Sequence, residues 1–122
     1  MTRAVVLFGH GSRDPAWRLP IEAVAERLRK RSPELAVRCA YLELTTPDLP
    51  DTTAELAAAG VTAVRVVPMF LGVGRHARED LPKIVATLRE QYPGLAFELQ
   101  PAVGENPRLL DLLADISSAD GI

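Results

Sequence analysis

The chain has 122 residues, and its charge is nearly balanced, with 14 Lys and Arg against 16 Asp and Glu. This length is typical of one domain, and 48% hydrophobic residues exclude a disordered chain. A formal net charge of −2 at pH 7 argues against a nucleic-acid partner, because binding to a phosphate backbone needs a basic surface.

The apolar runs and the single cysteine indicate where in the cell to expect the protein. No run is long enough for the core of a signal peptide or for a membrane span, and Cys39 has no second cysteine with which to form an internal disulfide. We therefore expect a single soluble domain over residues 1–122, located in the cytoplasm and without a membrane partner.

Two kinds of segment alternate along the chain. Short runs rich in β-branched and aromatic residues predict strands at 4–8, 35–42, 61–69 and 95–99. Apolar residues at helical spacing predict helices at 17–28, 48–59, 81–92 and 107–116. This alternation predicts an α/β fold: a three-layer domain with a four-stranded parallel sheet in the order 2-1-3-4 and helices on both faces.

Glycine, proline and asparagine support these boundaries. Gly60 is placed to end the second helix, and Asn106 with Pro107 is placed to begin the last one. Pro20 and Pro82 are expected in the first turns of their helices, where a missing N–H group costs little.

The candidate functional residues follow the predicted strands. His10 follows the first strand, Glu43 the second, and His76 the third. Parallel strands end at one edge of the sheet, and ligands of open α/β sheets bind at that edge, so we expect the three side chains in strand-to-helix loops around one site. Each residue taken singly has a plainer interpretation, as a hydrogen-bonded loop histidine or a solvated charge.

Two imidazoles and a carboxylate suggest two kinds of chemistry. They are suitable ligands for Co²⁺, Ni²⁺, Fe²⁺ or Zn²⁺, and in their unprotonated forms they can remove protons from a ligand. Other sites are excluded by the sequence letters. No Gly-Lys pair forms a phosphate-binding loop, and Gly9-His10-Gly11 lacks the third glycine of a dinucleotide fingerprint. Ser12 lacks the flanking glycines of a hydrolase nucleophile.

Three segments carry a family resemblance: LFGHGSRDPAW after the first strand, YLEL after the second, and VVPMFLGVGRHAREDLP around the end of the third. They resemble the class II chelatases, and more narrowly the short, single-domain CbiX-type sirohydrochlorin cobaltochelatases, over essentially the whole chain. The resemblance implies ATP-independent insertion of Co²⁺ into sirohydrochlorin for cobalamin synthesis, with no cofactor beyond the substrate metal ion. Close relatives insert Fe²⁺ for sirohaem, or Ni²⁺.

The resemblance also implies roles for individual residues. His10 and His76 are implied as catalytic residues, and together with Glu43 as metal ligands. Sirohydrochlorin carries several carboxylates, so the residues expected to bind it are polar or basic: Ser12, Arg13, Arg75 and Arg78, with Lys83 as a further basic candidate. Each of these basic side chains can equally be a solvated surface charge. Longer relatives fuse two such domains around one cleft, which implies a homodimer for this chain.

Other functions remain open at this stage. The same residues suit a sirohydrochlorin ferrochelatase or nickel chelatase, or a module that binds metal or tetrapyrrole without turnover. A non-haem iron oxygenase also uses two histidines and a carboxylate, but an α/β sheet without an oxidant-binding feature disfavours it.

Overall fold

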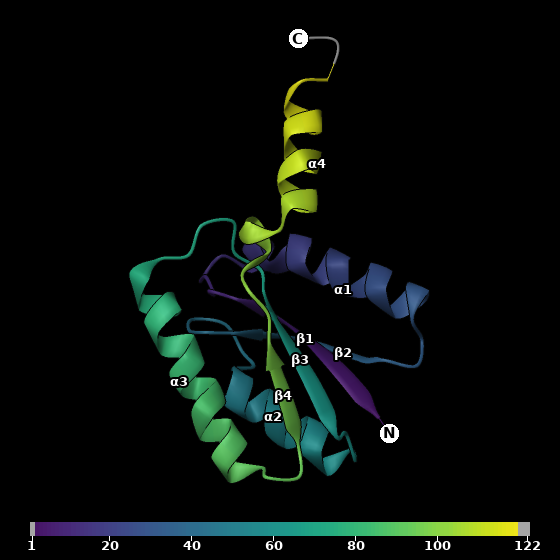
Figure 1. Ribbon diagram of the computed structural model, residues 1–122, viewed down its shortest axis with the longest axis vertical. Coiled ribbons are helices and arrows are strands. Elements are labelled where there is room, and N and C mark those ends of the chain that lie inside the picture. The colour runs from purple at the N-terminus through teal and green to yellow at the C-terminus, as the bar shows by residue number, and fades with distance from the viewer. Residues whose placement is uncertain (1, 120–122) are drawn as a thin grey trace.

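The computed structural model describes residues 2–119, which form one parallel sheet and its connecting helices (Figure 1). The strands are β1 (Arg3–Gly9), β2 (Ala36–Tyr41), β3 (Ala63–Pro68) and β4 (Ala96–Leu99), and their order in the sheet is β2-β1-β3-β4. The helices are α1 (Leu19–Arg31), α2 (Leu49–Ala58), α3 (Arg75–Gln91) and α4 (Pro107–Ser117), with short 3-10 turns η1 (Pro15–Arg18) and η2 (Val103–Glu105). The predicted strand order and parallel pairing are confirmed.

The sheet has a hydrophobic cluster on each face. Val6, Phe8 and Val66 pack on one face with Leu56 of α2 and Val85 of α3. The other face packs against α1, through residues of β1, β2 and that helix: Val5, Leu7, Val37, Ile21 and Ala25. Burial on both faces explains why β1 is a nearly continuous apolar run in the sequence.

The register of the sheet brings the strand ends level. Phe8, near the end of β1, lies opposite Ala40 of β2 and Pro68 of β3. The loops that follow these strands therefore leave the sheet at the same edge, as the sequence predicted. This alignment places the candidate residues after β1 and β2 next to each other.

Most predicted helix boundaries are confirmed. Asp48 caps α2, its Oδ1 accepting a hydrogen bond from the Asp51 N–H at 2.8 Å, and Asn106 caps α4 by accepting from the Arg108 N–H at 2.9 Å. Gly60 has a φ of 86° after the end of α2, a left-handed conformation that favours glycine.

The predicted start of the third helix is wrong. Helix α3 begins at Arg75, so Pro82 lies inside the helix rather than in its first turn, and it removes one internal hydrogen bond. Ala77 and Leu81, both buried, anchor the turns before Pro82 against the domain. This packing outweighs the local preference of proline for a helix start, which sequence spacing alone could not show.

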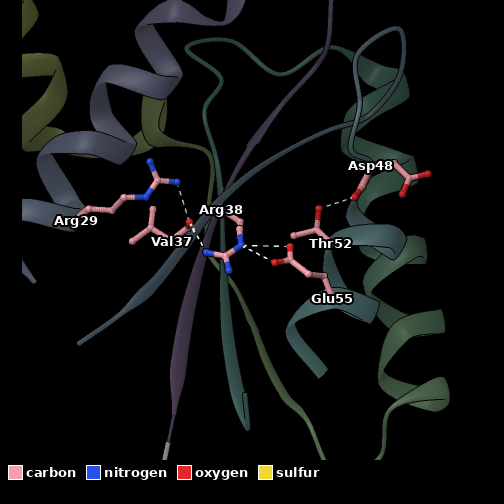
Figure 2. A network of polar contacts seen from close by, with 6 residues as sticks. All are labelled: Arg29, Val37, Arg38, Asp48, Thr52 and Glu55. Carbon is pink, nitrogen blue, oxygen red and sulfur yellow. Dashed lines mark hydrogen bonds and ion pairs between the residues drawn. The ribbon is translucent and has the colours of Figure 1, made fainter. Parts of the chain in front are cut away.

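Polar contacts protect the edge strand β2 (Figure 2). The Val37 carbonyl accepts hydrogen bonds from Nη2 of Arg29 at 2.9 Å and from Nη1 of Arg38 at 3.0 Å. The Arg38 guanidinium also pairs with the Glu55 carboxylate of α2 at 3.0 Å. An open strand edge invites pairing with another chain, and these arginines occupy a carbonyl that such a strand would use.

Helix α4 differs from the other three. It has no buried residue, its main contacts are with the turn η2, and it leads away from the sheet in Figure 1. The prediction of helices on both faces is thus confirmed by α1 on one face and by α2 and α3 on the other. None of the helices within residues 2–119 is long and apolar enough to cross a membrane.

Tyr41 offers a test of the packing below α1. Its ring is buried, and its hydroxyl has no hydrogen-bond partner among the described residues. Burial raises the pKa of Tyr41 to about 12. We expect Tyr41→Phe to leave the free energy of unfolding at pH 7 unchanged or to raise it by up to about 1 kcal/mol, because an unpaired buried hydroxyl is destabilising. Urea denaturation measures this, and a clear loss of stability would contradict it.

The same variant is expected to change how the free energy of unfolding depends on pH. The unfolded chain releases the tyrosine proton near pH 10, whereas the folded chain holds it until about pH 12. The wild type therefore loses stability as pH rises from about 10 to 12. Tyr41→Phe lacks that part of the loss, and the control Tyr92→Phe retains it because Tyr41 is unchanged.

Candidate functional site

His10 and Glu43 form a side-chain pair at the carboxyl edge of the sheet. His10 directly follows β1, Glu43 follows β2, and Nε2 of His10 donates a hydrogen bond to Oε1 of Glu43 at 3.1 Å. The carboxylate only accepts, so this hydrogen bond requires a proton on Nε2 of the imidazole, and a neutral ring with that proton carries its lone pair on Nδ1. The two side chains are 46% and 48% exposed, so the pair is open to solvent.

Backbone contacts hold the two loops together beyond the ends of the strands. The Leu42 N–H donates to the Gly9 carbonyl at 3.0 Å, and the Glu43 N–H donates to the His10 carbonyl at 3.1 Å. Thr45 adds a side-chain link, because its hydroxyl accepts from the Ser12 N–H at 3.0 Å and donates to the Ser12 carbonyl at 2.8 Å. The backbone therefore fixes the positions of both side chains of the pair.

Gly11 is required where the loops meet. Its φ is 106°, and a Cβ atom at this position would lie 1.6 Å from the Glu43 carbonyl oxygen. No side chain fits in that space, and L residues rarely adopt this backbone conformation. The glycine after His10 is therefore what allows the His10 loop to lie against Glu43.

Ser12 has a structural role in the same loop. Its hydroxyl accepts a hydrogen bond from the Asp14 N–H at 3.1 Å, and Asp14 Oδ1 accepts from the Ala16 N–H at 2.9 Å. These contacts shape the turn that leads into η1. Binding of substrate by Ser12 stays a prediction.

His76 lies in the first turn of α3, one residue after its start, and not in the loop where the sequence placed it. The early start of α3 at Arg75 is the reason for this difference. Nε2 of His76 lies 2.8 Å from Oδ2 of Asp80, and the His76 side chain is 73% exposed. Asp80 is not among the residues predicted from the sequence, although its spacing of four residues from His76 brings the two side chains together on a helix.

The structure thus shows two separate imidazole–carboxylate pairs. It does not gather His10, Glu43 and His76 into one metal centre: within residues 2–119, no three or more His, Cys, Asp or Glu side chains are grouped so as to hold a metal ion. A shared metal site of these three residues stays a prediction.

The basic residues singled out in the sequence are all exposed. Arg75 pairs with Glu79 at 3.1 Å, with 84% of the arginine side chain in solvent. Arg13 and Arg78 make no ion pair within the described part of the chain. Arg78 lines a pocket of about 190 Å³ next to Phe70 and Leu81. These cations are available to a carboxylate ligand.

Comparison with known proteins agrees with this architecture. The sirohydrochlorin cobaltochelatase of Methanopyrus kandleri is 38% identical over 82 residues, 67% of this chain and 57% of that protein. The chloroplastic sirohydrochlorin ferrochelatase of Arabidopsis thaliana is 27% identical over 111 residues, 91% of this chain and 49% of that protein. The chain therefore spans only about half of the length of these curated relatives.

A solved structure is similar over nearly its full length. The crystal structure of a CbiX protein from Marinobacter aquaeolei VT8 matches with a TM-score of 0.82 and 32% identity, covering 94% of this chain and 93% of that one. The sheet order and this neighbour place the fold among the chelatase-like α/β domains. A family model described as CbiX matches residues 4–119. The chain belongs to the CbiX family.

Replacement of Gly11 tests how the site is held. We expect Gly11→Ala to lower the free energy of unfolding by about 1–3 kcal/mol, because it forces a strained backbone and a clash with the Glu43 carbonyl. Urea denaturation measures the loss, and imidazole NMR shifts report whether His10 still contacts Glu43. Gly72→Ala is the matched control, since a Cβ there meets nothing within 4 Å. Equal stability of the two variants would contradict this account of the loop.

Proposed function

We propose that this chain is an ATP-independent sirohydrochlorin cobaltochelatase, which inserts Co²⁺ into sirohydrochlorin in cobalamin biosynthesis. The observation that carries the proposal is the exposed His10–Glu43 pair, which leaves a basic nitrogen free at the ligand-binding edge of the sheet. Membership of the CbiX family supports it, as does the Methanopyrus relative named as such an enzyme. Iron is the alternative metal, favoured by the relative named as a ferrochelatase.

The reaction makes two demands that such a pair meets. The incoming metal exchanges bound water for ring nitrogens, and two pyrrole N–H protons leave the ring. Nδ1 of His10 can take one of these protons or hold the metal ion during transfer, and the Glu43 carboxylate stabilises the positive charge that a proton adds to the ring. In this proposal the metal ion is a substrate, and the chain needs no further cofactor.

The second imidazole repeats the arrangement. His76 contacts the carboxylate of Asp80 in the way that His10 contacts that of Glu43. Two imidazoles are therefore available as bases for the two pyrrole protons. Asp80 acts through His76 and is a positioning residue in this proposal. Arg13, Arg75 and Arg78 bind the carboxylates of the tetrapyrrole, with Ser12 as a neutral donor.

The proposal includes a homodimer in the cytoplasm. The candidate site is open, with His76 73% exposed, whereas a flat macrocycle has to be covered on more than one side to exclude water. Cys39 is a free thiol, which fits a reducing compartment.

A turnover measurement distinguishes an enzyme from a module that binds its ligand without catalysis. The purified chain is mixed with excess sirohydrochlorin and Co²⁺, Fe²⁺ or Ni²⁺ without ATP, and the change in ring absorbance is followed. We expect metallated ring well in excess of protein, at the highest rate with Co²⁺. An absorbance change that stops at one ring per chain would show a non-catalytic module, and faster insertion of Fe²⁺ would make the chain a ferrochelatase.

Single substitutions test the two imidazoles. We expect His10→Ala and His76→Ala each to lower the rate of metal insertion by about 10²–10⁴-fold, the usual effect of losing a positioned proton acceptor. Stability changes little, because both side chains are exposed. Glu43→Gln lowers the rate less if the carboxylate only balances charge, and comparably if it is a ligand. A His10→Ala/His76→Ala double variant with the wild-type rate would overturn the proposal.

The Asp80→Asn variant tests whether Asp80 positions His76 or binds the substrate. The amide keeps the size of the side chain but not its charge, so we expect kcat to fall about tenfold while KM for sirohydrochlorin stays unchanged. Asp80→Glu should restore part of kcat. Glu90→Gln, near the other end of α3, is the matched control and should retain full activity. A rise in KM alone would instead assign Asp80 to substrate binding.

A further inference from the structure

A polar groove of about 500 Å³ lies between helix α1 and the edge strand β2. Small-molecule sites are typically clefts of about 300–1,000 Å³, so this groove has room for a metabolite. Four charged side chains of its lining come from η1 and α1, and two further side chains come from β2: Arg18, Glu22, Glu26 and Arg29, with Cys39 and Tyr41. The His10–Glu43 pair is not part of the lining, so the groove is separate from the candidate site.

Tyr41 brings an unsatisfied polar group to this groove. The residue is 2% exposed, and its hydroxyl has no hydrogen-bond partner among residues 2–119. Native proteins pair nearly all of their buried polar groups, so an exception calls for a partner from outside the chain. Burial raises the pKa of Tyr41 to about 12, so the hydroxyl keeps its proton at neutral pH and can donate it to an acceptor oxygen.

The chain holds the Tyr41 ring in place without using its hydroxyl. The loop after β2 folds back beside the strand, and the Pro47 carbonyl accepts a hydrogen bond from the Tyr41 N–H at 2.9 Å. Trp17 packs edge-on against the ring, with 5.9 Å between the ring centroids. The donor is therefore positioned before any ligand arrives, which lowers the entropy cost of binding.

Charges of both signs follow one another along the helix side of the groove. Arg18 pairs with Glu22 at 3.0 Å, and Arg29 pairs with Glu26 at 2.6 Å. Arg29 also donates to the Val37 carbonyl and is held by it (Figure 2). Exposed ion pairs of this kind contribute little to stability, so the Arg18–Glu22 pair can open and exchange its partners for those of a ligand.

We propose that this groove binds a small zwitterion of the amino-acid class. Its carboxylate accepts a hydrogen bond from the Tyr41 hydroxyl and pairs with the Arg18 guanidinium, while its ammonium pairs with the Glu22 carboxylate. The two arginines and two glutamates of the lining cancel in charge, so a ligand with both charges matches the groove better than an anion or a cation alone. This inference goes beyond the proposed function and does not depend on it.

The single cysteine provides a direct measurement of occupancy. Cys39 lines the groove as a free thiol, so a bound ligand slows its alkylation by iodoacetamide, which mass spectrometry follows at about pH 8.5, near the ordinary pKa of a thiol. The probes are free amino acids with aliphatic, polar, acidic and basic side chains at millimolar concentrations. We expect saturable protection by at least one of them. Its N-acetyl and amide forms, which carry one charge each, should bind about tenfold more weakly or worse.

Substitutions in the groove test the assigned contacts. We expect Tyr41→Phe and Arg18→Gln each to weaken the protecting amino acid by about tenfold, because each removes one hydrogen bond to its carboxylate. Tyr92→Phe and Arg27→Gln are the matched controls, since neither residue lines the groove. Arg18 is exposed, so its variant keeps the test valid even if Tyr41→Phe disturbs folding, which circular dichroism would show.

Three results would overturn the proposal. Labelling of Cys39 that no amino acid of the panel slows would show that the groove is not such a site. Equal protection by the N-acetyl form would show an anion site instead of a zwitterion site. Unchanged binding in Tyr41→Phe and Arg18→Gln would show that the amino acid binds elsewhere. None of these measurements involves sirohydrochlorin, so their outcome is independent of the chelatase assay.

Discussion

The candidate site depends on a close backbone approach between two loops. Gly11 lies so near the Glu43 carbonyl that a Cβ atom would meet it at 1.6 Å, and the hydrogen bond from the Glu43 N–H to the His10 carbonyl extends the β1–β2 pairing past both strands. Because backbone atoms make this contact, the His10 and Glu43 side chains remain free to face solvent. One short loop thereby combines a rigid backbone with exposed candidate side chains.

The hydrophobic core and the candidate site lie in different parts of the molecule. The two hydrophobic clusters lie within the sheet and under α1, α2 and α3, whereas both imidazole–carboxylate pairs lie on the surface. An exposed pair of this kind contributes little to folding. The side chains at the edge can therefore serve a ligand without changing the core that supports them.

The candidate site is open to solvent, and helix α4 buries none of its residues within residues 2–119. The His10, Glu43 and His76 side chains are 46%, 48% and 73% exposed, and the last helix exposes leucine and isoleucine to water. The homodimer proposed above would cover the site from a second side. The chain belongs to the CbiX family and spans about half of the length of the Arabidopsis ferrochelatase that it resembles.

The sequence by itself determined the order of the elements and the edge of the sheet at which the candidate residues lie. Buried runs such as β1, caps such as Asp48 and Asn106, and the right-handed rule for crossovers are local or general, so they could be read without coordinates. Only the tertiary structure decided the start of α3, since packing of Ala77 and Leu81 overrides the local effect of Pro82. It also decided the partners of the histidines and the separation of α4 from the sheet. Such contacts join residues through space, and no pattern along the chain records them.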